Sequence, residues 1–159
     1  SGYILEAIEE IRKLSKSLVS PLQPLLTLEA AISNLAEDIM IVHNLSIKIA
    51  AEGFETANFN GKFKLTIFRI VQEQLNNIIK HANSNNITIA LSSTDHSTRI
   101  EITDDGQGFD TSLQRNGVGL SNIRSRTQLY NGTMNIVSSP GEGCRLIVDF
   151  PRNESTGCV

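Results

Sequence analysis

The sequence is poor in the residues that mark several common protein classes. Its two cysteines, Cys144 and Cys158, are too few and too oddly placed for a disulfide framework or a metal site. We therefore expect reduced thiols in a cytosolic protein. The 14 basic and 17 acidic residues give a net charge of −3. Because the basic residues are scattered and form no stripe with aromatic residues, nucleic-acid binding is not expected.

Long apolar runs and two familiar nucleotide motifs are also missing. No run approaches the roughly 20 apolar residues of a membrane-spanning helix, and no signal-peptide pattern opens the chain. We expect no membrane contact by this segment, although a longer parent protein could be membrane-anchored. A P-loop does not occur, and the Gly-Xaa-Gly pair at Gly117 and Gly119 lacks the third glycine of a dinucleotide motif. Both of those nucleotide folds are therefore disfavoured.

The residues that are present favour one main domain with an appendage. An apolar content of 40% in 159 residues is typical of a chain that buries one core. Residues 3–18 carry an amphipathic pattern in which Ile4, Ile11 and Leu18 lie one heptad apart, as on a helix that packs against a partner. Pro21 and Pro24 then interrupt the chain.

The rest of the chain predicts an α+β fold. Apolar spacing near 3.6 residues predicts helices, and alternation predicts strands. The expected helices cover 28–42, 62–81 and 120–130, and the expected strands cover 45–49, 87–93, 98–103, 133–137 and 144–150. These elements predict a two-layer sandwich, in which a mixed, mostly antiparallel sheet carries helices on one face. Residues 152–159 are expected to form a loose tail.

Three short segments carry side chains suited to a nucleotide. Glu73 and Asn77 lie one turn apart on the polar side of a predicted helix, and their oxygens suit Mg²⁺. Gly117 and Gly119 precede another helix, whose free N–H groups suit a phosphate. Asp104 ends a strand just before Gly106 and Gly108, an arrangement that suits the edge of a base; an acidic hairpin turn is the alternative.

Four short motifs follow one another along the chain, and their order and spacing are informative. They are Glu73-Gln74-Leu75-Asn76-Asn77, Asp104-Asp105-Gly106-Gln107-Gly108-Phe109, Gly117-Val118-Gly119-Leu120 and Gly141-Glu142-Gly143. In order and spacing they resemble the nucleotide site of a sensor histidine kinase, and the resemblance extends from Tyr3 to Pro151. It implies the histidine kinase ATPase fold, in the subfamily with a short lid, with ATP and Mg²⁺ as ligands.

The resemblance also implies individual roles. Asp104, rather than Asp105, would accept the adenine amino group, and Asn77 would bind Mg²⁺. Glu73 would order water near the metal or act as a base, while Lys80 could reach a phosphate. His81 matches a position that often holds histidine, and Arg115 in the lid could contact phosphates. The remaining expected contacts of the nucleotide are Gly106, Gly108, Gly117, Gly119, Leu120, Gly141, Gly143 and Cys144.

One position departs from the family pattern. Cys144 stands where the family usually has threonine, so it lacks a hydroxyl that could support the adenine pocket through water. Because a thiol is a poor donor, weaker but not absent binding is expected. A degenerate nucleotide-binding module that regulates a partner without transferring phosphate is therefore an alternative. A gyrase-related hydrolase is disfavoured, because only about ten residues separate the second and third motifs.

The resemblance finally implies domains and partners. Residues 1–24 would be the C-terminal half of a dimerisation hairpin with its linker, 25–151 the catalytic ATP-binding domain, and 152–159 a flexible tail. His43, His81 and His96 all lie outside the context of a phosphoacceptor, whose helix we expect to be absent here. A full-length protein would form a homodimer through the hairpin and pass the phosphoryl group to a response regulator.

Overall fold

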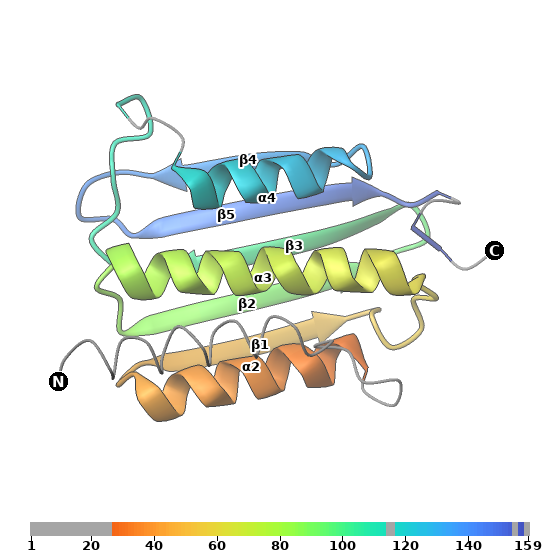
Figure 1. The fold of residues 1–159 in the computed structure, drawn as a ribbon, viewed down its shortest axis with the longest axis horizontal. Helices are drawn as coiled ribbons and strands as arrows, with labels where there is room; N and C mark the ends of the chain where they lie inside the picture. The colour runs from red at the N-terminus through yellow and green to blue at the C-terminus, as the bar shows by residue number, and fades with distance from the viewer. Residues whose placement is uncertain (1–26, 114–116, 154–155, 158–159) are drawn as a thin grey trace, which may run out of the picture.

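A computed structural model of the chain describes residues 27–113, 117–153 and 156–157 (Figure 1). The expected helix over 3–18, the remainder of the 1–24 segment, Arg115 and Cys158 lie outside these ranges. The described elements, in chain order, are α2 (Leu28–Val42), β1 (Ser46–Glu52), α3 (Gly61–His81), β2 (Asn86–Ser93), β3 (Ser97–Asp104), α4 (Val118–Gln128), β4 (Thr133–Ser138) and β5 (Cys144–Pro151).

The strands form one five-stranded sheet in the order β1-β2-β3-β5-β4. Strands β1 and β2 pair in parallel, and the other neighbours pair antiparallel. Helices α2, α3 and α4 cover one face of this sheet (Figure 1). The predicted α+β sandwich with a mixed, mostly antiparallel sheet is therefore confirmed.

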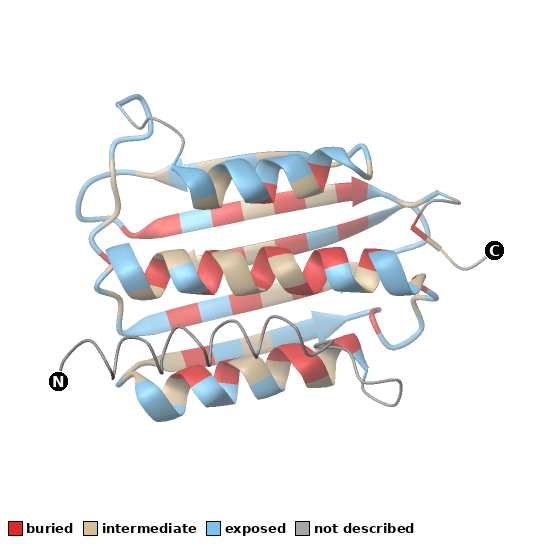
Figure 2. Ribbon diagram, viewed as in Figure 1, coloured by how far each residue is buried: buried red, intermediate tan, exposed pale blue. Residues whose placement is uncertain are grey.

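The core lies between α3 and the sheet. Inward-facing residues of β2, β3 and β5 alternate with exposed or half-buried ones, and α3 presents its buried side to them (Figure 2). The fully buried side chains include Ile67, Ile70, Val71 and Leu75 of α3 and Ile87, Ile89, Leu91, Ile100, Ile102, Leu146 and Val148 of the sheet. Each contributes on the order of 1.5–3 kcal/mol through burial, so α3 is held firmly and its polar residues are fixed in place.

An aromatic cluster secures the start of α3. The rings of Phe59, Phe63 and Phe150 meet edge to face, with centroids 5.2 and 5.0 Å apart, the geometry that aromatic pairs prefer. The N-cap Asn60 accepts a hydrogen bond from the Phe63 amide at 2.9 Å, which satisfies a free donor of the first turn. The C-terminal half of the same helix, from Glu73 to His81, borders the cavity described below.

The described part of the C-terminal segment differs from the loose tail that the sequence predicts. Thr156 is fully buried, and Gly157 forms an isolated β-bridge with Phe59. The Arg152 guanidinium lies 5.3 Å from the centre of the Phe59 ring and donates to the Thr94 carbonyl at 3.3 Å. Arg152, Thr156 and Gly157 are thus anchored by contacts with segments distant in sequence.

Asp105 is a structural residue of the turn after β3. Its carboxylate accepts hydrogen bonds from the Ser84 hydroxyl, the amides of Asn85 and Asn86, and the Asn86 side chain, at 2.7–2.9 Å. These bonds, led by those from Asn86, lower the pKa of Asp105 below its usual value of 3.8. The carboxylate therefore connects the start of β2 to the end of β3. Its oxygens are used in these bonds, so we do not expect Asp105 to bind a ligand.

Replacing Asp105 with alanine is expected to destabilise the fold by about 1 kcal/mol, a small value because the bonds are exposed. Since the folded state lowers this pKa, the stabilisation is complete above about pH 4 and is lost as the pH falls below it. Thermal melting at pH 7 and pH 3 measures the effect. The difference in melting temperature between native chain and Asp105→Ala should shrink at pH 3, and an unchanged difference would contradict this role.

Candidate functional site

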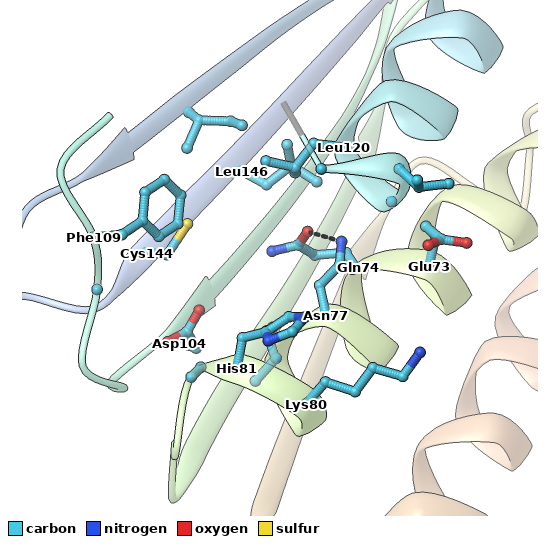
Figure 3. A pocket seen from close by; sticks show the side chains of 17 residues that line it. Glu73, Gln74, Asn77, Lys80, His81, Asp104, Phe109, Leu120, Cys144 and Leu146 are labelled. Atoms are coloured by element: carbon cyan, nitrogen blue, oxygen red, sulfur yellow. Dashed lines mark hydrogen bonds between the residues drawn. The ribbon is translucent and has the colours of Figure 1, made fainter. Parts of the chain in front are cut away.

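A cavity of about 400 Å³ opens between the C-terminal half of α3 and the start of α4, above the ends of β3 and β5 (Figure 3). Residues of the first three motifs line it, and so does Cys144, which directly follows the fourth motif. Its lining includes the predicted residues Glu73, Asn77, Lys80, His81, Asp104, Gly108, Gly117, Gly119, Leu120 and Cys144. Gly106, Gly141 and Gly143 do not line it; they shape the loops that support it.

Asp104 provides the buried charge of the cavity. The residue is 4% exposed, and its Oδ1 accepts a hydrogen bond from the Gly106 amide at 2.9 Å. Its Oδ2 has no hydrogen-bond partner among the residues that the structure describes. Burial raises the pKa of this carboxyl, and the Gly106 amide partly opposes the shift. Because buried acceptors are almost always paired, Oδ2 is suited to an N–H group of a ligand.

Close backbone contacts hold the glycine loops beneath Asp104. Gly143 has a φ of +70°, and a Cβ there would collide with the carbonyl oxygen of Asp104. Only glycine tolerates both that conformation and that approach. Gln107 joins the loops, because its amide donates to the Ala82 carbonyl and its carbonyl accepts from the Gly141 amide, both at 2.7 Å. The end of α3 and the two loops therefore form one support.

Glu73, Asn77 and Gly119 converge at the opposite end of the cavity. A Cβ on Gly119 would lie 2.5 Å from Asn77 Oδ1 and 2.8 Å from Glu73 Oε1. The start of α4 therefore rests directly on the polar side of α3, and Figure 3 shows both side chains on that side. Carboxylate and amide oxygens are ligands that Mg²⁺ accepts.

These two residues fit a magnesium ion that is held partly by a substrate. The described residues contain no group of three or more His, Cys, Asp or Glu side chains suited to a metal. Mg²⁺ usually takes one or two protein ligands and completes its shell with water and substrate phosphates. Glu73 and Asn77 alone would not fill the coordination shell of Mg²⁺. A phosphate-bearing ligand and water would have to supply the remaining oxygens.

The start of α4 offers backbone donors. Gly117 is its N-cap and has no side chain to bond the first-turn amides, which are left unpaired within the helix. The positive end of the helix dipole points in the same direction. An anionic group in this part of the cavity would therefore be favoured.

Lys80 and His81 lie at the exposed edge of the cavity. The His81 carbonyl accepts a hydrogen bond from the Gln107 side chain at 2.6 Å, so the backbone of His81 has a structural role. Its imidazole and the Lys80 ammonium remain available to a ligand (Figure 3).

Cys144 forms part of the cavity wall. It is the first residue of β5 and is 9% exposed. Burial, and then the negative charge of Asp104, raises the pKa of its thiol to about 11. The thiol is therefore protonated at neutral pH, which makes it a poor nucleophile.

Several lining residues were missed by the sequence reasoning. Phe109, Val118, Ile136 and Leu146 supply much of the apolar wall, together with Ile78. Strand alternation could have placed Ile136 and Leu146 on the helix-covered face, but it does not reveal which end of a strand borders a cavity. Phe109 and Val118 lie at loop ends, where no periodic signal exists.

Comparison with known proteins gives the family. Residues 64–154 match the family described as histidine kinase-, DNA gyrase B- and HSP90-like ATPases. The sensor histidine kinase MctS of Rhizobium johnstonii is 30% identical over 92% of this chain, and the histidine-protein kinase/phosphatase UhpB of Salmonella typhimurium is 37% identical over 56% of it. The chain covers only 32% and 17% of these relatives, respectively.

Solved structures show the same fold. The histidine kinase domain of a blue-light activated kinase of Erythrobacter litoralis superposes with a TM-score of 0.60 at 20% identity, over 79% of this chain and 65% of that one. The ATP binding domain of PrrB from Mycobacterium tuberculosis also gives 0.60, at 19% identity, over 77% of this chain and 92% of that one. Among the described residues, no helix is long and apolar enough to cross a bilayer. The chain belongs to the histidine kinase-, DNA gyrase B- and HSP90-like ATPase family, and it is an ATPase domain of the sensor histidine kinase type.

Proposed function

We propose that this domain binds Mg-ATP in the cavity and presents the γ-phosphoryl group to a histidine on a dimerisation helix. One observation carries the proposal: a single cavity has an unpaired buried carboxylate oxygen at one end and the oxygen-bearing side chains of Glu73 and Asn77 beside a helix N-terminus at the other. A purine with an amino group suits the first end. A magnesium-bound polyphosphate suits the second.

The base would lie between apolar walls at the Asp104 end. Ile78, Phe109, Ile136 and Leu146 belong to the lining of the cavity, so a flat aromatic ring bound in it would displace water from apolar surface. Asp104 Oδ2 would then accept the exocyclic amine. Because Oδ1 is already held by the Gly106 amide, the carboxylate is oriented before the ligand arrives.

The triphosphate would extend toward Glu73, Asn77 and the α4 N-terminus. A magnesium ion bound there would neutralise charge on the transferring phosphoryl group. In the proposal Asn77 Oδ1 ligates the metal, and Glu73 orients a metal-bound water or accepts a proton. Lys80 would attract phosphate oxygens from the edge of the cavity. The chain thus contributes mainly positioning and electrostatics.

The domain boundaries and the partners are a further part of our proposal. We propose that residues 1–24 belong to a dimerisation hairpin, that 25–151 form the catalytic domain, and that a homodimer and a response regulator complete the system. We also propose a cytosolic location for this domain, in a longer parent protein that could be membrane-anchored. The support is that MctS and UhpB are named as sensor and signal transduction kinases.

The degenerate-module alternative has no structural support. It rested on Cys144 alone, and that residue belongs to the wall of the cavity without displacing Asp104, Asn77 or Glu73. Residues of the first three motifs line one cavity, and the fourth lies in the loop directly before Cys144. An active kinase domain is therefore the function that the geometry supports best.

The unmodified domain is expected to prefer ATP over GTP by about tenfold to a hundredfold. Guanine presents an oxygen where adenine has its amine, and facing a buried carboxylate it would forfeit a hydrogen bond worth about 1.5–3 kcal/mol. Asp104→Asn should abolish the preference, because an amide can both donate and accept. Calorimetric titration with each nucleotide measures it, and Asp105→Asn is the adjacent control that should keep it. Equal affinity of the native domain for both nucleotides would contradict the assignment.

Phosphoryl transfer tests the proposed function itself. The chain is incubated with γ-labelled ATP and Mg²⁺, alone and with an intact dimerisation hairpin of a closely related sensor kinase. We expect no acid-labile label on the chain, because His43, His81 and His96 lack the setting of an acceptor, and label on the added hairpin. Label at any of these three histidines would overturn the acceptor assignment. Binding of ATP without transfer to any hairpin supplied would instead favour the degenerate module.

A further inference from the structure

A second hollow lies at the end of the molecule opposite to the cavity. Its volume is about 340 Å³, and residues at the start of α2, in the loop between β1 and α3, and in the first turn of α3 line it. Figure 1 shows these three segments together at one end of the sheet, whereas the cavity borders the C-terminal half of α3. The lining residues are Thr27, Leu28, Glu29, Phe54, Glu55, Ala57, Phe59 and Lys64.

The apolar side chains of the hollow are fixed in position. Leu28, Phe54 and Phe59 supply most of them, and the two rings meet edge to face with centroids 5.3 Å apart. Backbone bonds hold the loop that carries the rings. The Ala57 amide donates to the Phe54 carbonyl at 3.1 Å, and the Phe59 amide donates to the Ala57 carbonyl at 3.0 Å. Because removing apolar surface from water is favourable, a preformed hollow of this kind suits an apolar occupant.

A buried carboxylate oxygen in the same lining lacks a partner. Glu29 belongs to the hollow, and its Oε1 is inaccessible to solvent and has no hydrogen-bond partner among the residues that the structure describes. Buried acceptors are almost always paired, so the occupant should also supply an N–H group. An apolar stretch of polypeptide offers both features, because every residue except proline carries a backbone N–H.

The described part of the chain begins beside this hollow. Thr27 lines it and is the N-cap of α2, where its hydroxyl accepts a hydrogen bond from the Ala30 amide at 3.2 Å. The six residues directly before it are Pro21-Leu22-Gln23-Pro24-Leu25-Leu26. Three of them are leucines, and the two prolines disfavour helix in this segment. An apolar residue just before an N-cap commonly packs against the first turns of the helix that follows.

We propose that residues 22–26 dock in this hollow, with Leu25 and Leu26 on its apolar lining and a backbone N–H of the segment bonded to Glu29 Oε1. The hollow is then a docking site within the chain that fixes where the preceding segment leaves the domain. At 1.5 Å per residue, Lys64 and Asn77 are about 20 Å apart along α3. The preceding segment therefore leaves about 20 Å from the proposed metal site. This inference does not depend on nucleotide binding.

Nuclear Overhauser effects in the full chain test the docking. The leucine methyl groups are isotope-labelled, and their contacts with the rings of Phe54 and Phe59 are recorded. Leu28 lines the hollow and should give such contacts, so it is the internal control. We expect contacts from Leu25 and Leu26 as well. If Leu28 gives them and neither of the other two does, the inference is wrong. Contacts seen only between differently labelled copies would mean that a second molecule fills the hollow, which would also overturn it.

Thermal melting measures what the docking contributes. Leu25→Ser/Leu26→Ser should lower the melting temperature by about 3–10 °C, because two leucines lose a buried position. Leu113→Ser/Leu129→Ser makes the same change at leucines that are 80% and 75% exposed, and it should lower the melting temperature by less than about 2 °C. Both variants remove two leucines from the unfolded chain, so their difference reports contacts of the folded state. Equal melting of the two variants would contradict the docking.

Discussion

Asn77→Ala is expected to reduce Mg²⁺-dependent phosphoryl transfer to an added dimerisation hairpin by about a hundredfold or more. In our proposal Asn77 Oδ1 is a protein ligand of Mg²⁺. Without this oxygen the protein would no longer hold the ion beside the phosphates. The melting temperature should change little, because Asn77 lies on the polar side of α3 and alanine is the better helix former. Single-turnover transfer of labelled phosphate measures the effect.

The neighbouring asparagine is the matched control. Asn76 is exposed and does not line the cavity, so Asn76→Ala makes the same chemical change one residue away and should retain transfer. Affinity for adenosine should be similar in both variants, since the base end is untouched. Full magnesium-dependent transfer by Asn77→Ala would exclude this residue as a ligand.

Gly119→Ala is expected to lower transfer by about tenfold to a hundredfold in a folded protein. The added methyl group would lie against Asn77 Oδ1 and Glu73 Oε1. Both atoms are at the ends of side chains that can move aside, so the fold survives while the proposed metal site is displaced. A displacement of about 1 Å can reduce a rate by a hundredfold.

A second glycine substitution controls for the change of residue type. Gly61 begins α3 at the end distant from the cavity, and a Cβ there meets no atom within 4 Å. Gly61→Ala should keep full transfer and leave melting unchanged or slightly raised. If Gly119→Ala also keeps full transfer, or if it unfolds the chain, the role given to this close approach is wrong.

The sequence predicted most elements because their patterns are local. The buried stripe of α3 and the alternation in β2, β3 and β5 follow from periodicity alone, and these elements differ from expectation by at most one residue at each end. The start of α4 at Val118 rather than Leu120 reflects an N-cap glycine, which leaves the boundary without a side-chain signal.

Long-range contacts explain what the sequence could not predict. Arg152 is anchored by the ring of Phe59, and the carbonyl of Thr156 accepts a hydrogen bond from the Asn60 amide at 3.2 Å; periodicity does not connect these segments. Likewise, two adjacent aspartates look equivalent in sequence, and only the fold shows Asp105 bonded to the start of β2 while Asp104 Oδ2 is buried and unpaired. The resemblance predicts the ligand role for Asp104, and this difference between the two carboxylates is a physical reason to expect it; the role itself stays a prediction.

Chemical-shift mapping would show whether Mg-ATP binds in the cavity between α3 and α4. Amide resonances of the chain are followed while Mg²⁺ and a non-hydrolysable ATP analogue are added. If Mg-ATP binds in the cavity, the largest shifts should occur at Asn77, Asp104, Gly119 and Cys144. The shifts near Asn77 and Gly119 should require Mg²⁺. Shifts confined to the separate hollow lined by Leu28, Phe54 and Lys64, or no shifts at millimolar nucleotide, would contradict it.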